Sequence, residues 1–182
     1  MGGRSSSFRA KKSGGGRPSL PELQGSEKQT KWANEIRQKW LNKIDKFEKN
    51  GEVEDYNEDR DGLIHLAQYG NMGESGSLDA DFPEFASGGV YKSSLKESYD
   101  DAMSGFVPSE REVQNRVRDY YKTVMSTYNK YAPKGKVPDD NKAYDKYTDQ
   151  ESRAYRKTLV QMARRSVNKV ADASDYINHY RL

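Results

Sequence analysis

The sequence predicts a mainly α-helical protein, and three observations support this fold class. Apolar residues recur at intervals of three and four positions in several long segments, which is the period of one helix face. Three segments begin with the Ser/Thr-x-x-Gln/Glu spacing of a capping box. No segment shows the apolar-polar alternation of a half-buried strand. We expect a single helical domain at residues 25–182, preceded by a disordered basic arm and containing a long acidic, Gly-rich central loop.

The composition predicts a thin hydrophobic core. The chain has 182 residues, which is the length of one ordinary domain. Charged residues make up 32% of it, above the roughly 25% typical of globular proteins, and hydrophobic residues make up 33%. The 13 tyrosines partly compensate, because each ring buries a large area while its hydroxyl can remain hydrated.

Residues 1–24 are predicted to be a disordered basic arm. Few large apolar residues occur there, so the segment lacks the buried area that would offset its ordering entropy. Its cations are Arg4, Arg9, Lys11, Lys12 and Arg17. Two interpretations remain open: a solubilising tail, or an arm that contacts phosphates.

The first helix is predicted over residues 26–49. Ser26 and Gln29 have the spacing of a capping box, and Asn50-Gly51 supplies a left-handed stop. One face is apolar and the opposite face is rich in lysine, with Trp32 at the edge of the apolar stripe. The stripe contains Ala33, Ile36, Trp40, Ile44 and Phe47. We expect both tryptophans in the core.

The middle of the chain is acidic and irregular. A short helix is predicted over residues 62–69, and five glycines mark a long loop over residues 70–90. Within this loop, Asp79, Asp81 and Glu84 lie among aromatic residues and are the candidate acidic partner-binding residues. The alternative is that Phe82 and Phe85 attach the loop to the protein's own core.

Three further helices are predicted, over residues 91–105, 109–131 and 148–178. The second begins at a Ser109–Glu112 capping box, and the third at a Thr148–Glu151 capping box after a solvent-exposed connection at 133–147. The apolar face of the second contains Val113, Val117, Tyr120 or Tyr121, Val124, Tyr128 and Tyr131. That of the third contains Tyr155, Leu159, Met162, Ser166, Val170, Ala173 and Ile177.

Charge is segregated along the chain. Residues 1–51 carry 12 Lys and Arg against 5 Asp and Glu, residues 52–110 carry 3 against 14, and residues 111–182 carry 16 against 9. The three parts therefore have net charges of +7, −11 and +7. The acidic part either neutralises its basic flanks within the fold, or the two signs serve two partners.

A basic ridge is predicted on the last helix. At 100° per residue, Arg153, Lys157 and Arg164 lie on one side of it, nearly opposite the apolar face. The whole ridge comprises Arg153, Arg156, Lys157, Arg164, Arg165 and Lys169. It is either a solvated face or a surface that binds phosphates without reading bases.

No catalytic or cofactor-binding motif occurs in the sequence. There is no cysteine, and His65 and His179 are the only histidines. Two pairs of carboxylates have the chemistry of a magnesium site: Asp79 with Asp81, and Asp100 with Asp101. Nothing in the sequence shows that the carboxylates converge, so we expect no metal and no cofactor. We also expect no enzymatic activity. No signal peptide or membrane-spanning segment is present, which predicts a cytoplasmic protein without membrane partners.

Residues Leu20–Arg37 resemble a segment that recurs in small proteins of bacterial phages and mobile elements, in which Gly-Ser-x-Lys-Gln precedes Trp-Ala-x-x-Ile-Arg. Here those positions are Gly25, Ser26, Lys28, Gln29, Trp32, Ala33, Ile36 and Arg37. The opening Met-Gly-Gly-Arg-Ser-Ser-Ser also resembles those of phage-associated proteins. The whole chain most resembles the anti-CRISPR inhibitors of type II RNA-guided nucleases.

This resemblance implies a non-enzymatic protein in the bacterial host cytoplasm. It would bind a type II CRISPR effector nuclease with its guide RNA, and block target DNA binding or cleavage. The alternative is a phage or mobile-element accessory protein that binds double-stranded DNA or assists packaging, and a third is a self-assembling structural protein. The oligomeric state, the nuclease and the inhibited step are not indicated by the sequence.

Overall fold

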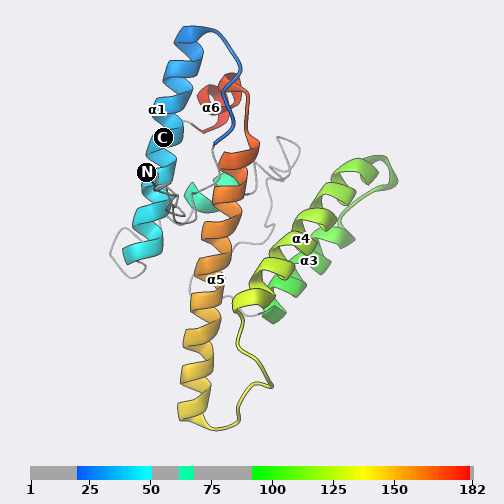
Figure 1. The fold of residues 1–182 in the computed structure, drawn as a ribbon. Coiled ribbons are helices and arrows are strands. Elements are labelled where there is room, and N and C mark those ends of the chain that lie inside the picture. The colour runs from blue at the N-terminus through cyan, green and yellow to red at the C-terminus, as the bar shows by residue number, and fades with distance from the viewer. Residues whose placement is uncertain (1–19, 51–61, 68–91, 181–182) are drawn as a thin grey trace, which may run out of the picture.

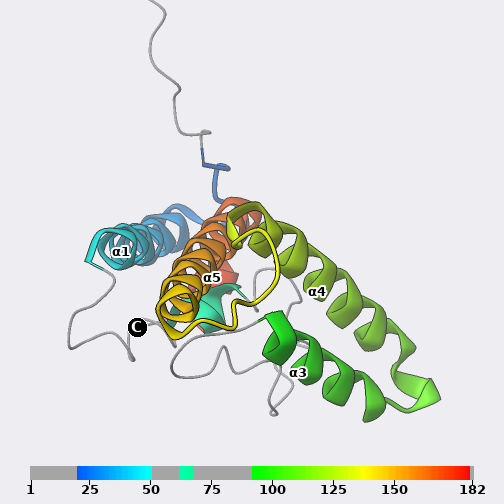
Figure 2. The ribbon, with the colours of Figure 1, turned by 90° about the horizontal axis from the view of Figure 1, so that it is seen from below.

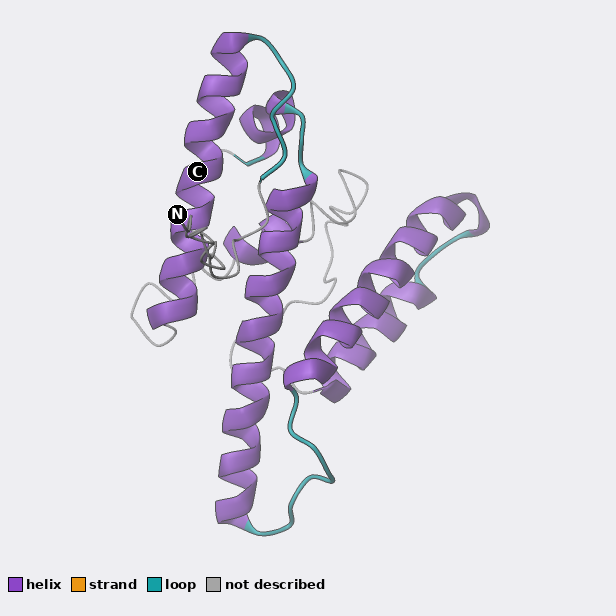
Figure 3. Ribbon diagram, viewed as in Figure 1, coloured by secondary structure: helices purple, strands orange, loops and turns teal. Residues whose placement is uncertain are grey.

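The computed structural model describes residues 20–50, 62–67 and 92–180, and every regular element among them is a helix (Figure 3). The helices are α1 (Glu27–Asn50), a short helix at 62–67, α3 (Lys92–Ser104), the 3-10 helix η2 (Pro108–Glu110), α4 (Arg111–Tyr131), α5 (Asn141–Lys169) and α6 (Ala173–His179). The prediction of a mainly α-helical fold is confirmed. The arm cations at 4–17, the Asn50-Gly51 stop and the acidic loop with Asp79, Asp81 and Glu84 involve positions outside the described residues.

Helix α5 lies in the middle of the molecule. Figure 1 shows α1 and α6 on one side of it and the α3–α4 pair on the other. The view in Figure 2 shows the same order and places α3 alongside α4. The most extensive contacts join α5 to α4, α1 to α6 and α1 to α5. Since α5 is covered on two sides, it buries ten residues along its length.

The start of α1 agrees with the predicted capping box. The Gln29 amide donates to Ser26 Oγ at 3.4 Å, and the Ser26 amide donates to Gln29 Oε1 at 3.0 Å. Gly25 precedes it with φ of +145°, and a Cβ there would lie 3.1 Å from the Ala173 Cβ. A larger residue at position 25 would therefore combine backbone strain with a collision against α6.

Residues 20–24 form a strap against the junction of α5 and α6, so the prediction that the disordered arm extends to residue 24 is wrong for these five residues. Leu23 is buried. The Gln24 amide donates to the Ala171 carbonyl at 2.7 Å, and the Ala173 amide donates to the Gln24 carbonyl at 2.9 Å. The Arg37 guanidinium also donates to the Pro21 carbonyl at 2.7 Å. These long-range bonds supply the order that local composition does not.

The apolar stripe predicted for α1 is buried at all five positions. Trp40 is anchored further, because its indole N–H donates to the Tyr180 carbonyl at 2.8 Å. The prediction that both tryptophans lie in the core is wrong for Trp32, which is 39% exposed. Its place at the edge of the stripe explains this, since the partners of α1 cover only the centre of that face.

Helix α4 is extended at its start by η2, and the predicted capping box is displaced by two residues. The Val107 amide, not that of Ser109, is capped, and it donates to Glu110 Oε2 at 3.1 Å. Pro108 follows Val107 and is compatible with the first helical position because it has no amide hydrogen to satisfy. Along α4, Val117, Tyr120, Val124 and Tyr128 are buried, whereas Tyr131 is 36% exposed.

The helix predicted over 148–178 differs from the structure at both ends. Asp140 caps α5 by accepting from the Ala143 amide at 2.9 Å, so residues 141–147 are helical and not a solvent loop. Thr148 lies inside α5, where its hydroxyl donates to the Asp145 carbonyl, and the predicted Thr148–Glu151 box does not form. The helix ends at Lys169, and Asp172 begins α6 by capping Ser174 at 2.8 Å. The break coincides with the two backbone bonds to Gln24, which replace helical bonds that the local pattern would predict.

We predict that Leu23→Ala lowers the free energy of unfolding by about 2–3 kcal/mol, because a buried leucine side chain leaves a cavity between the strap and the helices. Urea unfolding followed by circular dichroism measures the change. Val137→Ala, at a site 55% exposed, is the control and should alter stability by less than about 0.5 kcal/mol. Equal effects of the two substitutions would contradict a structural role for the strap.

Candidate nucleic-acid interface

The six cations of the predicted basic ridge have different environments in the structure. Helix α5 contacts both α1 and α4, so its buried arc is wide and leaves a narrower exposed side. Arg153, Lys157, Arg165 and Lys169 are exposed, whereas Arg156 and Arg164 are half-buried. Arg153, Lys157 and Arg164 lie on one side of α5, whereas the six cations differ in how far neighbouring helices cover them.

Arg164 is bound to α1. Its Nη2 lies 2.9 Å from Asp45 Oδ1 and 2.5 Å from Glu48 Oε2, and its Nη1 lies 3.3 Å from Glu48 Oε1. The side chains of Arg164 and Asp45 are only 28% and 29% exposed. This partly desolvated arrangement links α5 to α1, and it neutralises a cation that the sequence alone assigns to solvent.

Near the middle of α5, the cations Arg153, Arg156 and Lys157 have three different environments. The Lys157 ammonium lies 5.6 Å from the centre of the Tyr131 ring, within the range of a cation–π contact. Arg156 has a buried Nε without a hydrogen-bond partner among the described residues. Arg153 is exposed. Lys157 thus connects the ridge to the last residue of α4.

A groove of about 630 Å³ lies between the strap, α1, α4 and α5, and four cations line it. We call it the interhelical groove. The lining residues are Leu20, Gln38, Leu41, Asp45, Thr127, Lys130, Tyr131, Gln161, Arg164, Arg165, Asn168 and Lys169.

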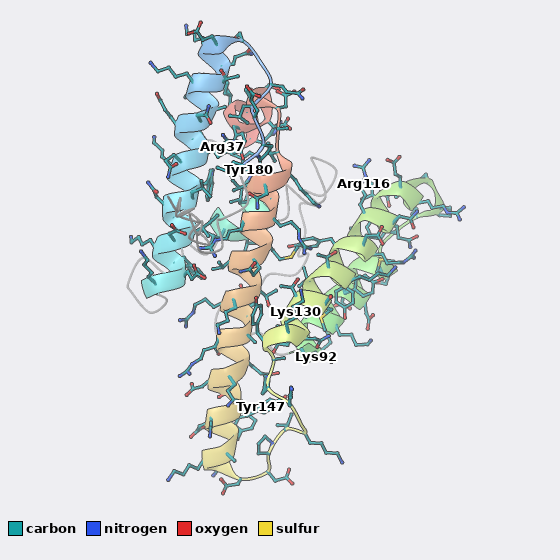
Figure 4. All side chains as sticks on the ribbon, viewed as in Figure 1. Arg37, Lys92, Arg116, Lys130, Tyr147 and Tyr180 are labelled. Carbon is teal, nitrogen blue, oxygen red and sulfur yellow. The ribbon has the colours of Figure 1, made fainter. Side chains whose placement is uncertain are left out.

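The interhelical groove is basic. Lys130, Arg164, Arg165 and Lys169 line it, and Asp45 is the single carboxylate among the described lining residues. Figure 4 shows Lys130 near the end of α4 that approaches α5. Three of these cations belong to the predicted ridge, but Lys130 was missed, because it lies on another helix and only the packing of α4 against α5 brings it to the groove.

A second cavity, of about 410 Å³, surrounds the carboxyl group of Glu151. Its lining is mostly apolar and includes Tyr121, Met125, Val137 and Tyr147. Figure 4 shows Tyr147 on α5 and Lys92, another lining residue, at the start of α3. Glu151 is 4% exposed. The sequence placed this residue in a helix cap and did not predict its burial.

Burial raises the pKa of the Glu151 carboxyl above its ordinary value. Tyr128 donates a hydrogen bond to Glu151 Oε1 at 3.2 Å, and Oε2 is buried with no hydrogen-bond partner among the described residues. Burial, together with the neighbouring carboxylate, also raises the pKa of the Tyr128 hydroxyl. The pair therefore holds its protons more firmly than exposed groups would, which suits a structural contact between α4 and α5.

Among the described residues, neither Asp100 with Asp101 nor the two histidines form a metal site, and the Asp79–Asp81 pair lies outside those residues. Asp100, which the sequence pairs with Asp101, forms an ion pair with Lys96. His65 Nε2 lies 3.1 Å from the His179 carbonyl oxygen, so a ring nitrogen of His65 faces the backbone of His179. Within residues 20–50, 62–67 and 92–180, no three His, Asp or Glu side chains are grouped in a way that could hold a metal ion.

Comparisons of this chain with protein-family models, curated proteins and solved structures give no match. None of the described helices is long and apolar enough to cross a membrane.

The raised pKa of Glu151 predicts how stability depends on pH. The folded state binds this proton more tightly than the unfolded chain does, so the stabilisation is complete below the unfolded pKa of about 4.3 and is lost as pH rises through the folded pKa. Glu151→Gln keeps an acceptor for Tyr128 and removes the titration. We expect the variant to be more stable than the wild type at pH 7, and the difference to shrink toward pH 4.

Urea unfolding at a series of pH values measures this effect, with Glu97→Gln at an exposed position of α3 as the control for loss of one carboxylate. A stability difference between Glu151→Gln and wild type that does not change with pH would refute the assignment of a desolvated carboxyl.

Proposed function

We propose that this chain is a non-catalytic protein that binds nucleic acid through the interhelical groove. The observation that carries the proposal is the convergence of Lys130, Arg164, Arg165 and Lys169, from two helices, on a groove whose lining contains one carboxylate. Such a charge arrangement suits a phosphate backbone, which provides closely spaced negative charges. Contacts of this kind position a protein on its ligand without identifying the bases.

The two cations that give the clearest support are Lys130 and Arg165. Both side chains are exposed, and neither forms an ion pair or hydrogen bond with another described residue. Their positive charge is therefore available to a ligand. Arg164 differs, because Asp45 and Glu48 already bind it. We expect it to shape the groove and to contribute less to affinity.

The basic residues of the N-terminal segment are connected to the same groove by the chain itself. Leu20 is one of the groove's lining residues. Arg17 precedes Leu20 by three positions in the sequence. This closeness along the chain supports the interpretation of the basic N-terminal segment as one that contacts phosphates.

A more specific proposal is that the nucleic acid belongs to a type II RNA-guided nuclease that this protein inhibits. The resemblance of Leu20–Arg37 to segments of phage and mobile-element proteins, and the net charge of −11 on residues 52–110, support it. An acidic segment suits a nucleic-acid channel of the nuclease, and the basic groove suits guide RNA or target DNA. The alternative, a phage or mobile-element DNA-binding or packaging accessory, needs only the basic groove.

We predict that Lys130→Gln combined with Arg165→Gln weakens nucleic-acid binding. The magnitude of the slope of log K against log salt should fall by about 1.5, because each lost phosphate contact lowers that magnitude by about 0.7–0.9. Fluorescence anisotropy of a labelled oligonucleotide between 50 and 300 mM salt measures both quantities. Lys142→Gln with Lys146→Gln is the matched control, because these exposed lysines lie on α5 outside the groove. Equal loss in the two double variants would show that binding depends on net charge and not on the groove.

The inhibitor proposal predicts suppression of target cleavage when the protein is titrated into a purified type II effector with its guide RNA. Inhibition should be complete near equimolar protein and should weaken in the Lys130→Gln, Arg165→Gln variant. Undiminished cleavage by several effectors, together with binding of free nucleic acid, would favour the accessory function instead.

A further inference from the structure

We infer that the interhelical groove binds single-stranded nucleic acid, DNA or RNA, with one base stacked on the ring of Tyr131. The inference rests on the proposed function and identifies the form of its ligand. It is carried by the composition and shape of the groove: an exposed aromatic ring, apolar side chains and amides lie among the four cations.

The shape of the site favours a single strand over a duplex. Proteins read a duplex by inserting a protruding helix or a strand pair into its grooves, because its phosphates lie on a convex surface and its base faces are stacked inside. The site here is a concavity between helices. A single strand can enter such a concavity and expose the faces of its bases to the protein.

Tyr131 has the position of a stacking platform. It is the last residue of α4, it lines the groove and it is 36% exposed. One turn earlier, Tyr128 is fully buried and bonded to Glu151, which fixes the end of the helix that presents Tyr131. The Lys157 ammonium lies over one face of the Tyr131 ring, 5.6 Å from its centre, and Lys157 is not one of the groove's lining residues, so the base would stack on the other face. A base stacked on this ring would have its phosphate near Lys130.

The rest of the lining suits the other parts of a nucleotide. Leu20 and Leu41 add apolar surface. Gln161 and Asn168 are exposed amides on α5, and each can donate and accept hydrogen bonds at the edge of an unpaired base. A duplex buries those base edges in pairs, so amides beside an aromatic ring are most useful to a strand with free bases.

The experiment compares the affinities of the full chain for labelled dT12, rU12, dA12 and a 12-base-pair duplex by fluorescence anisotropy. We expect tighter binding of the single strands than of the duplex. Tyr131→Ala should weaken single-strand binding about tenfold, in line with the stabilisation that one stacked base provides, and Tyr131→Phe and Tyr131→Trp should retain it. The ratio of rU12 to dT12 affinity indicates whether RNA or DNA is the preferred ligand.

Two controls separate stacking from charge and from folding. Tyr144→Ala removes a tyrosine that is 40% exposed outside the groove and should leave affinity unchanged. Tyr131→Ala should also leave the salt dependence unchanged, because it removes no phosphate contact, and its helical circular dichroism should match the wild type.

Failure of the stacking inference and failure of the proposed function give different results in this experiment. Equal affinity for duplex and single strands, or a Tyr131→Ala variant that binds as the wild type does, overturns the stacking inference and leaves the basic groove as a general phosphate site. Failure of the wild-type protein to bind any of the oligonucleotides at 50 mM salt overturns the proposed function itself.

Discussion

The burial of α5 on two sides is the constraint on which the rest of the structure depends. A helix that packs against one neighbour can present a broad polar face, but α5 contacts both α1 and α4 and buries ten residues, among them Glu151, Thr158 and Ser166. Polar groups within so wide an arc must find partners. Thr158 and Ser166 donate to backbone carbonyls, and Glu151 accepts from Tyr128. The cations of α5 lie on its exposed side or at the edges of the buried arc, and three of them, Arg164, Arg165 and Lys169, line the interhelical groove.

The end of α5 shows how a chain of low hydrophobic content stabilises a sharp change of direction. Gln24 bonds to both sides of the break between α5 and α6, so the strap replaces the helical hydrogen bonds that are lost there. Tyrosine completes this region: the Tyr176 hydroxyl donates to the Val167 carbonyl at 3.1 Å, and the Tyr180 carbonyl accepts from Trp40. Large rings fill the space, while their polar ends or backbone groups remain bonded. Residues at opposite ends of the described chain therefore stabilise one another.

The two cavities beside α5 have different characters, and the difference bears on function. The Glu151 cavity has a mostly apolar lining around a desolvated carboxyl that a neighbouring tyrosine already binds, an arrangement that joins α4 to α5. The interhelical groove combines exposed cations, amides and an aromatic ring from four segments of the chain. Of these two cavities, the interhelical groove is the one that offers charge, hydrogen-bonding groups and an exposed ring together. Asp45 and Glu48 partly neutralise the charge of Arg164. The positive potential of the groove therefore depends mainly on its other cations.

The sequence by itself determined the helical class, the Ser26–Gln29 cap and the buried stripe of α1, because these depend on interactions within one helix or on a single apolar face. It also indicated Arg165 and Lys169 as candidate ligand-binding cations. Only the tertiary structure decided that α5 breaks after Lys169, that Arg164 pairs with α1, and that Lys130 and Tyr131 join the groove. Each of these depends on contacts between residues far apart in the chain. A local pattern records the spacing of side chains along one helix, but it carries no information on which neighbouring helix covers them.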